Sequence, residues 1–204
     1  MEPFVKSGNI YPISNFVQDE LLHDTIIVKD FSKIKLFFLS NLLEEKGINI
    51  LLNVIEKLHS QGIFFEVKIA GALIDSNPLP KLNTLKDVYY LGVVEGNTKK
   101  ELLLWGNVFC LPTYFSMEGQ PISIIEAMAF DNFIVTTQHA GIPDICSHNN
   151  ALFCDIKSEE SLFSILTFLH QNWQSISPLG VKNGMYARER FTEERFIQSI
   201  INVM

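Results

Sequence analysis

Short runs of apolar residues alternate with longer amphipathic stretches along most of the chain. The runs are rich in β-branched and aromatic residues, which is typical of strands buried on both faces of a sheet. They predict strands at 34–39, 64–70, 88–91, 108–111, 133–137 and 151–154. The remaining stretches carry apolar residues at helical spacing. They predict helices near 46–60, 99–105, 121–130, 158–171, 179–190 and 192–204.

This regular alternation predicts the fold class: a Rossmann-like three-layer α/β domain with a parallel sheet of about six strands. In such a sheet, ligands bind at the carboxyl ends of the strands. The loops that follow strands are therefore where a functional site is expected.

Residues 1–33 are mixed in polarity and show no sustained period. We interpret them as a lead-in or interdomain linker region with one short strand at Thr25–Lys29. The α/β domain then covers 34–204 and ends in a C-terminal helix. The Pro-rich segment 78–80 predicts a loop.

The composition is that of a globular protein, with 204 residues, of which 47% are hydrophobic. A domain of this size needs no disulfide or metal to stabilise it. The cysteines are odd in number and lack metal-ligand spacing, so we predict reduced core residues of a cytosolic protein. They are Cys110, Cys146 and Cys154. No apolar run reaches the ~18 residues that a membrane span needs, and no signal-peptide pattern is visible.

The net charge of −7 disfavours nonspecific binding to nucleic acid or to an anionic membrane. The basic residues are also unevenly distributed, because the only three arginines are Arg188, Arg190 and Arg195. A phosphate bound by the rest of the chain must therefore be held by lysine or by backbone amides.

Several well-known motifs are absent from the loops. There is no G-x-G-x-x-G, which argues against a dinucleotide-binding dehydrogenase, and no G-x-x-x-x-G-K-[ST] of a P-loop. No G-x-S-x-G, H-E-x-x-H or paired C-x-x-C occurs, and the histidines are dispersed. An Asp-x-Asp pair that could hold a diphosphate through a cation is also missing, so no metal is expected.

The most informative loop follows the strand predicted at 108–111. Gly119 allows a ligand to approach the backbone closely, and Pro121 suits the first turn of the next helix. The unpaired N–H groups of that helix and the positive end of its dipole would face the functional edge of the sheet. The loop therefore predicts an anion site.

That helix is apolar on nearly every side, and only Ser123 and Glu126 interrupt it. Such a helix is buried, and a carboxylate inside it needs a partner because burying an unpaired charge is costly. Two interpretations of Glu126 stay open at this point. It has a structural partner such as a loop amide, or it faces the cleft and accepts hydrogen bonds from ligand hydroxyls.

Lys46 stands at the start of the first predicted helix. The helix dipole disfavours a cation there unless an anion lies there too. The alternative is a surface lysine paired with Glu44 or Glu45, which would contribute little to stability.

Seven residues separate Glu118 from Glu126, with Leu-Pro-Thr before them and Ala-Met-Ala after. This Glu-x7-Glu pattern resembles the signature of the retaining family-4 (group 1) glycosyltransferases of the GT-B type. Further segments match landmarks of that family in the right order, and the resemblance covers residues 34–203. These segments are 40–47, 67–71, 90–92 and 135–145.

The resemblance implies that the chain is the C-terminal, nucleotide-sugar-binding half of a two-domain enzyme. Glu118 would contact sugar hydroxyls near the reacting carbon, and Glu126 would hold the ribose hydroxyls. Lys46 would neutralise the diphosphate as it leaves, which is electrostatic stabilisation where charge develops. The amides around Gly119 to Ile122 would hold the distal phosphate. The implied nucleotide-binding residues are Ser40, Asn41, Gly119, Gln120, Pro121, Ile122 and Glu126.

One departure from the family matters for the diphosphate. The family has Gly-Arg after the first strand, where this chain has Ser40 and Asn41. Asn41 can donate a hydrogen bond but brings no charge, which implies weaker or differently arranged diphosphate binding. No metal or organic cofactor is implied, and a UDP-, GDP- or ADP-sugar is the implied donor substrate.

The family's N-terminal acceptor domain is missing from these residues, so we expect the isolated chain to bind nucleotide but to transfer sugar poorly or not at all. Its C-terminal helix, which braces the acceptor domain in the family, is then expected to be exposed. The resemblance implies a glycan or lipid-linked acceptor. It also implies a cytoplasmic enzyme, or one peripheral at the inner face of the membrane without insertion.

Two alternative functions remain open. One is a nucleotide-binding or interaction module without catalysis, for which Asn41 is the best argument. The other is a nucleotide-sugar epimerase of GT-B architecture. The Glu-x7-Glu spacing favours the transferase.

Overall fold

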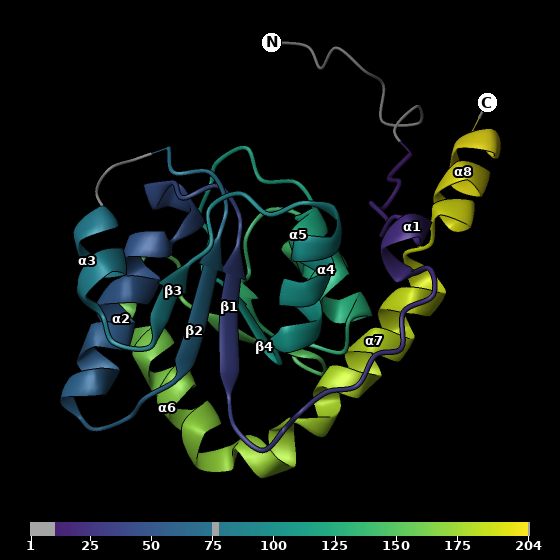
Figure 1. Cartoon of the computed structure of the whole chain (residues 1–204). Coiled ribbons are helices and arrows are strands. Elements are labelled where there is room, and N and C mark those ends of the chain that lie inside the picture. Colours follow the sequence, from purple (N-terminus) through teal and green to yellow (C-terminus); the bar gives the residue numbers. More distant parts are fainter. Residues whose placement is uncertain (1–10, 75–77, 204) are drawn as a thin grey trace, which may run out of the picture.

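The computed structural model describes residues 11–74 and 78–203, and it forms three layers with a parallel sheet in the middle (Figure 1). The sheet has six strands in the order β3-β2-β1-β4-β5-β6. They are β1 (Lys35–Leu39), β2 (Glu66–Ala70), β3 (Val88–Tyr90), β4 (Val108–Leu111), β5 (Phe133–Thr137) and β6 (Ala151–Cys154). The predicted fold class is confirmed.

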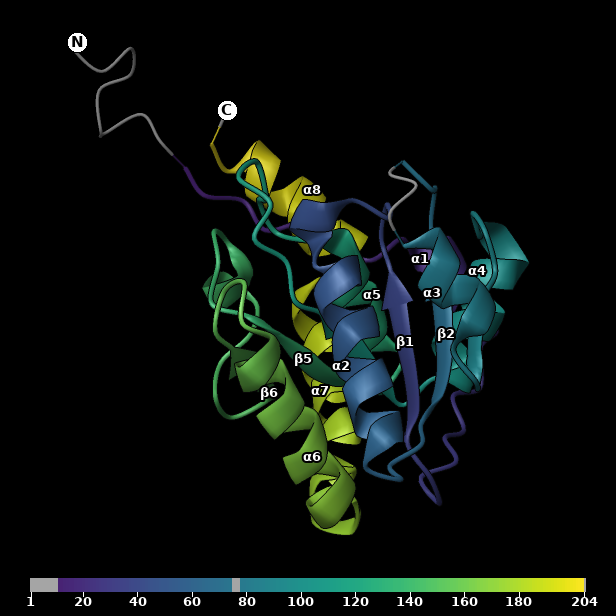
Figure 2. The same ribbon diagram turned by 90° about the vertical axis from the view of Figure 1, so that its left-hand side faces the viewer.

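Helices cover both faces of this sheet. They are α1 (Asp19–Leu22), α2 (Ile48–Ser60), α3 (Leu79–Thr84), α4 (Gly96–Trp105), α5 (Ile122–Ala129), α6 (Glu159–Ile176), α7 (Pro178–Arg190) and α8 (Glu193–Ile201), with 3-10 turns η2 (Glu44–Lys46) and η3 (Ile142–Asp144). The α2, α3 and α6 helices lie on one face, and α4, α5 and α7 lie on the other (Figures 1 and 2). No helix of the described residues is both long and apolar enough to span a membrane.

The central strands explain the uninterrupted apolar runs of the sequence. Every residue of β4 and β5 is buried, and so are four of the five residues of β1. Strands covered by helices on both faces have no solvent side, so they show no alternation of polar and apolar residues.

Two local predictions are wrong. The Pro-rich segment forms α3, because Pro78 stands directly before the first helical turn, where a missing N–H costs nothing. Thr25–Lys29 forms no strand but an extended coil without a partner strand. Within this segment, Ile27 packs against the core, while Ile26 and Val28 are exposed.

Two glycines allow the strand exits to approach one another. Gly71 directly follows β2 with φ +141°, and a Cβ there would lie 1.8 Å from the carbonyl oxygen of Ser40. Gly47 stands between η2 and α2 with φ +81°, and a Cβ there would lie 2.3 Å from the carbonyl oxygen of Pro112. These contacts join loops at the carboxyl edge, so the glycines set the spacing between the exits of β1, β2 and β4.

Lys29 attaches the lead-in region to the end of α4. Its Nζ donates to the carbonyls of Leu103 and Gly106 at 2.5 Å each and to Asn132 Oδ1 at 3.0 Å. Carbonyls at a helix C-terminus lack intrahelical donors, so the Lys29 amino group satisfies acceptors that would otherwise be unpaired. Burial lowers the pKa of Lys29 to about 7, although the charge of Asp131 opposes that shift.

Replacing Gly71 with alanine is expected to disrupt the exit of β2. The added Cβ would clash with the Ser40 carbonyl and also force alanine into a left-handed conformation. We expect Gly71→Ala to lower the free energy of unfolding by about 2–5 kcal/mol, measured by urea denaturation. Gly62→Ala is the control, because Gly62 has φ +76° but nothing within 4 Å of its Cβ position. Equal losses in the two variants would contradict the proposed clash.

Lys29 should make stability depend on pH. Between the folded pKa of about 7 and the ordinary value of 10.5, the unfolded state binds more protons, so rising pH stabilises the fold through this group. The difference in the free energy of unfolding between wild type and Lys29→Met should therefore grow by about 1–3 kcal/mol from pH 7 to pH 9. Urea denaturation at each pH measures it. Lys33→Met is the control, because Glu66 raises the pKa of the exposed Lys33 and keeps it charged throughout this range. A pH-independent difference for Lys29→Met would refute this role.

Candidate functional site

The loop between β4 and α5 runs along the carboxyl edge of the sheet. Gly119 is exposed, and Pro121 stands directly before Ile122, the first residue of α5. Within residues 11–74 and 78–203, the backbone N–H groups of Gly119, Gln120 and Ile122 have no acceptor in the protein. This arrangement is compatible with the anion site that the sequence predicts.

Glu118 and Lys46 form an ion pair across two loops. Lys46 Nζ lies 2.8 Å from Glu118 Oε2, and the two side chains are only 14% and 7% exposed. The Thr113 hydroxyl donates to the same carboxylate oxygen at 3.0 Å. Lys46 Nζ also lies 4.5 Å from the centre of the Phe115 ring, a cation–π distance. The structure therefore gives Lys46 an ion-pair partner far away in the sequence.

Glu126 lies in the middle of α5 and is buried. Its partner is Lys99 of α4, whose Nζ lies 2.6 Å from Glu126 Oε1. The side chain of Glu126 is 6% exposed and that of Lys99 is 23% exposed, so the pair reaches solvent through the lysine. Glu126 thus has a partner within the protein, which is a lysine and not a loop amide. That Glu126 accepts hydrogen bonds from ligand hydroxyls stays a prediction.

Neighbouring loops hold the backbone of the 112–121 segment. Tyr114 N donates to the carbonyl of Glu45 at 2.7 Å, and His139 Nε2 lies 2.8 Å from the carbonyl oxygen of Phe115. Gly141 N donates to the carbonyl of Gly119 at 3.1 Å. The loops after β1 and β5 thus fix the loop after β4 from both sides.

The remaining predicted residues lie along the same edge. Ser40 and Asn41 directly follow β1, where Ser40 N donates to the carbonyl of Ala70 at 3.1 Å and Asn41 is exposed. Pro121 is buried, whereas Ile122 is 49% exposed. Because β1 and β4 are neighbours in the sheet, the structure brings all the predicted site residues to one edge.

Sequence analysis missed three residues at this edge, which are Lys99, Thr113 and Asn15. Thr113 lies inside the Leu-Pro-Thr pattern, so a signal for it existed. Lys99 and Asn15 belong to segments with no motif, and only the fold shows that they reach Glu126 and Gln120.

The two ion pairs are balanced in charge, with two lysines against two glutamates. The arginines contribute nothing to these pairs. Arg188 Nη1 lies 2.8 Å from Asp131 Oδ1, and the others belong to α7 and α8. Lysine and backbone amides are therefore the donors that this edge offers to a phosphate.

The cysteines play no part in this site. Burial raises the pKa of Cys110, and it raises those of Cys146 and Cys154 to about 12, so the thiols stay protonated. Among the described residues, no cluster of three or more histidine, cysteine, aspartate or glutamate side chains could hold a metal ion.

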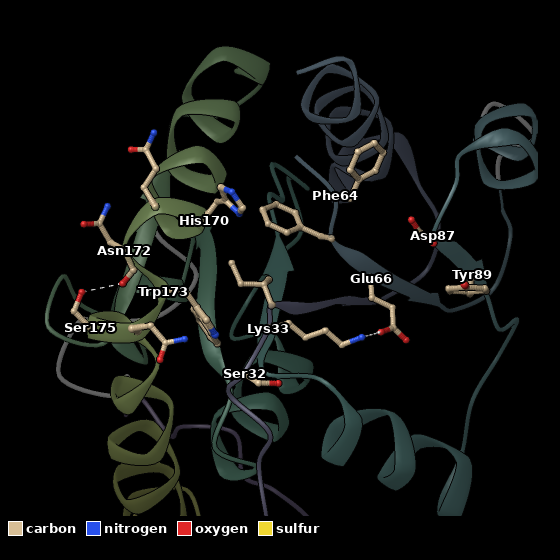
Figure 3. A pocket seen from close by; sticks show the side chains of 14 residues that line it. Ser32, Lys33, Phe64, Glu66, Asp87, Tyr89, His170, Asn172, Trp173 and Ser175 are labelled. Carbon is tan, nitrogen blue, oxygen red and sulfur yellow. Dashed lines mark hydrogen bonds and ion pairs between the residues drawn. The ribbon is translucent and has the colours of Figure 1, made fainter. Parts of the chain in front are cut away.

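A wide cavity of about 850 Å³ lies at the opposite, amino edge of the sheet (Figure 3). Several of its polar groups are engaged in structural contacts. Lys33 Nζ lies 2.8 Å from Glu66 Oε2, and the indole N–H of Trp173 donates to the carbonyl of Phe31 at 2.9 Å. The carboxyl edge, with its convergent ion pairs and unpaired amides, is therefore the better candidate for the functional site.

Comparison with known proteins agrees with this fold. The family model described as "Glycosyl transferases group 1" matches residues 33–172, which is more than half of the chain. The putative colanic acid biosynthesis glycosyltransferase WcaL of Escherichia coli is 27% identical over 183 residues, covering 83% of this chain and 43% of that protein. The chain thus spans less than half the length of this relative.

Solved structures show the same fold at low sequence identity. S. aureus TarM, in a complex that includes UDP, matches with a TM-score of 0.81 at 20% identity, covering 99% of this chain and 40% of that one. Anabaena HepE, in complex with UDP-glucose, matches with a TM-score of 0.69 at 16% identity, covering 84% and 48%. The three-layer fold is that of GT-B glycosyltransferase structures, and the chain belongs to the group 1 glycosyltransferases.

Proposed function

We propose that this chain is the C-terminal, donor-binding half of a glycosyltransferase that moves a sugar from a nucleotide-diphospho-sugar to a glycan or lipid-linked acceptor with retention. The observation that carries the proposal is the position of Glu118 and Glu126. Glu118 lies in the loop before α5 and Glu126 lies in the middle of that helix, and each has a lysine within 3 Å. The structures of TarM with UDP and of HepE with UDP-glucose make UDP-sugars the first donors to test.

The geometry suggests a role for each group. Glu118, in the loop before α5, would accept hydrogen bonds from hydroxyls of the transferred sugar, and Glu126 would accept them from the ribose diol. The free amides of Gly119 and Ile122 would hold the distal phosphate, assisted by the dipole of α5. No metal is needed for this arrangement, because amides and lysine supply the positive potential.

Lys46 would stabilise the leaving group. Its ammonium is held between Glu118 and the Phe115 ring, so it lies beside the carboxylate assigned to the sugar. A cation there would neutralise the charge that develops on the diphosphate as the glycosidic bond breaks. With Asn41 in place of an arginine, Lys46 would carry most of this task.

The C-terminal helix supports the view that a second domain completes the enzyme. No residue of α8 is buried, and Ile197 and Ile201 are 50% and 57% exposed. The expected exposure of this helix is therefore confirmed. An N-terminal acceptor domain lying against α8 would cover this apolar face, and without that domain we expect binding without efficient transfer.

Nucleotide binding by the isolated chain is the first test. A ligand at 100 times its Kd stabilises a fold by about 2.7 kcal/mol, which should raise the Tm by roughly 5–10 °C. We expect this shift with one of the UDP-, GDP- or ADP-sugars and a smaller shift for Glu126→Gln, measured by thermal denaturation. Glu160→Gln, an exposed change on α6, should behave as wild type. No shift with any donor at millimolar concentration would favour a module without catalysis.

The role of Lys46 can be separated from that of Glu126. We expect Lys46→Met to raise the Kd of the preferred nucleoside diphosphate about tenfold, because one charge-assisted hydrogen bond to phosphate is lost. The Kd of the matching nucleoside should stay unchanged, and calorimetry measures both values. Lys57→Met, on the exposed face of α2, is the control. An equal loss of affinity for nucleoside and diphosphate would show that Lys46 acts on the fold and not on the phosphates.

A further inference from the structure

The lead-in region contacts the loop between β4 and α5, residues 112–121, directly through Asn15, and we call this segment the donor loop. The backbone N–H of Asn15 donates to Gln120 Oε1 at 2.9 Å, and Asn15 Nδ2 donates to the Gln120 carbonyl at 2.7 Å. The two residues are 105 positions apart, and both are partly buried. Two parallel bonds between the same pair of residues fix orientation as well as distance, so Asn15 acts as a clamp on Gln120.

Asn15 holds Gln120, a residue of the loop to which the neighbouring loops donate no hydrogen bond within the described residues. His139 and Gly141 engage the carbonyls of Phe115 and Gly119, and within the described residues Asn15 supplies the only donors to Gln120. Gly119, the preceding residue, meets no other atom within 4 Å of its Cβ position. Asn15 thus supplies both of the hydrogen bonds that hold Gln120, the residue between Gly119 and the buried Pro121.

The residues after Asn15 connect the same segment to the C-terminal helices. The rings of Phe16 and Phe196 lie 4.5 Å apart, which places Phe16 against α8. Val17 is buried, and its N–H donates to the carbonyl of Phe191 at 2.9 Å. Three consecutive residues thus join the donor loop, the end of α7 and α8.

We propose that Asn15 is a positioning residue for the phosphate-binding part of the donor loop, and that the Asn15–Val17 segment couples this loop to α8. The inference rests on the proposed function, because the ligand that benefits is the nucleoside diphosphate. Asn15 acts through Gln120, and it orients the amides that follow Gly119. A displacement of α8 would be transmitted through Phe16 to the same loop.

The first measurement needs no ligand. Hydrogen–deuterium exchange of residues 116–123 should become about fivefold faster or more in Asn15→Ala, because a net hydrogen bond of about 1 kcal/mol is lost. Asn15→Asp keeps the size of the side chain and the backbone N–H but loses the Nδ2 donor, so it should also accelerate exchange. Phe16→Ala should accelerate exchange in the same segment if α8 is coupled to it. Asn83→Ala, an exposed change on α3, is the matched control.

The second measurement is the Kd of UDP, GDP and ADP by calorimetry. We expect about a fivefold weaker Kd for the preferred nucleotide in Asn15→Ala and Asn15→Asp, with the exchange of β4 and β5 amides unchanged. Unchanged exchange at 116–123, or faster exchange with an unchanged Kd, would overturn the role of Asn15. Faster exchange only in Asn15→Ala would reduce that role to packing. If wild type binds none of the three nucleotides, the proposed function fails, while the exchange data still decide whether Asn15 holds the loop.

Discussion

The candidate site depends on one backbone contact, the approach of Gly47 to Pro112. A Cβ at Gly47 would lie 2.3 Å from the Pro112 carbonyl oxygen, so no other residue fits between η2 and the exit of β4. Just beyond it, Tyr114 N donates to the Glu45 carbonyl at 2.7 Å and keeps the two loops in register. Only at this separation can the Lys46 side chain reach Glu118. The ion pair is therefore a consequence of how two strand exits pack, and the chemistry of the edge follows from the sheet order that makes β1 and β4 neighbours.

The charge balance of the edge explains how an arginine-poor chain could still hold a diphosphate. An arginine presents a planar fork that suits two oxygens at once, whereas lysine is a compact charge on a flexible stem. Lys46 and Lys99 each form an ion pair with a carboxylate, which places two lysines and two glutamates together at this edge. A ligand that has both hydroxyl donors and phosphate acceptors can interact with the carboxylate and with the lysine of each ion pair. In the proposed function, the carboxylates would accept hydrogen bonds from the hydroxyls, and the ammonium groups would turn toward the phosphates.

Much of the fold could be predicted from the sequence, because periodicity reports burial. The strands from β1 to β6 were recognisable as short apolar runs of the sequence. The errors arose where local signals conflict. Proline at 78 and 80 suggested a loop, although a helix tolerates it in its first turn. The partner of Glu126 was unpredictable for a different reason: Lys99 lies on another helix, and only the crossover of α4 onto the face that carries α5 brings them together.

The same reasoning explains why the lead-in region was undervalued. Its composition lacks period, yet Asn15 holds Gln120, Val17 is buried and Lys29 donates to the end of α4. These contacts follow no regular spacing along the sequence. A coil that crosses several helices and strands contacts whichever groups those elements present, so its own sequence shows no helical or strand periodicity. Asn15 and Phe16, adjacent in sequence, contact the donor loop and the exposed α8 helix. A domain that covered α8 would therefore act on the loop through two residues.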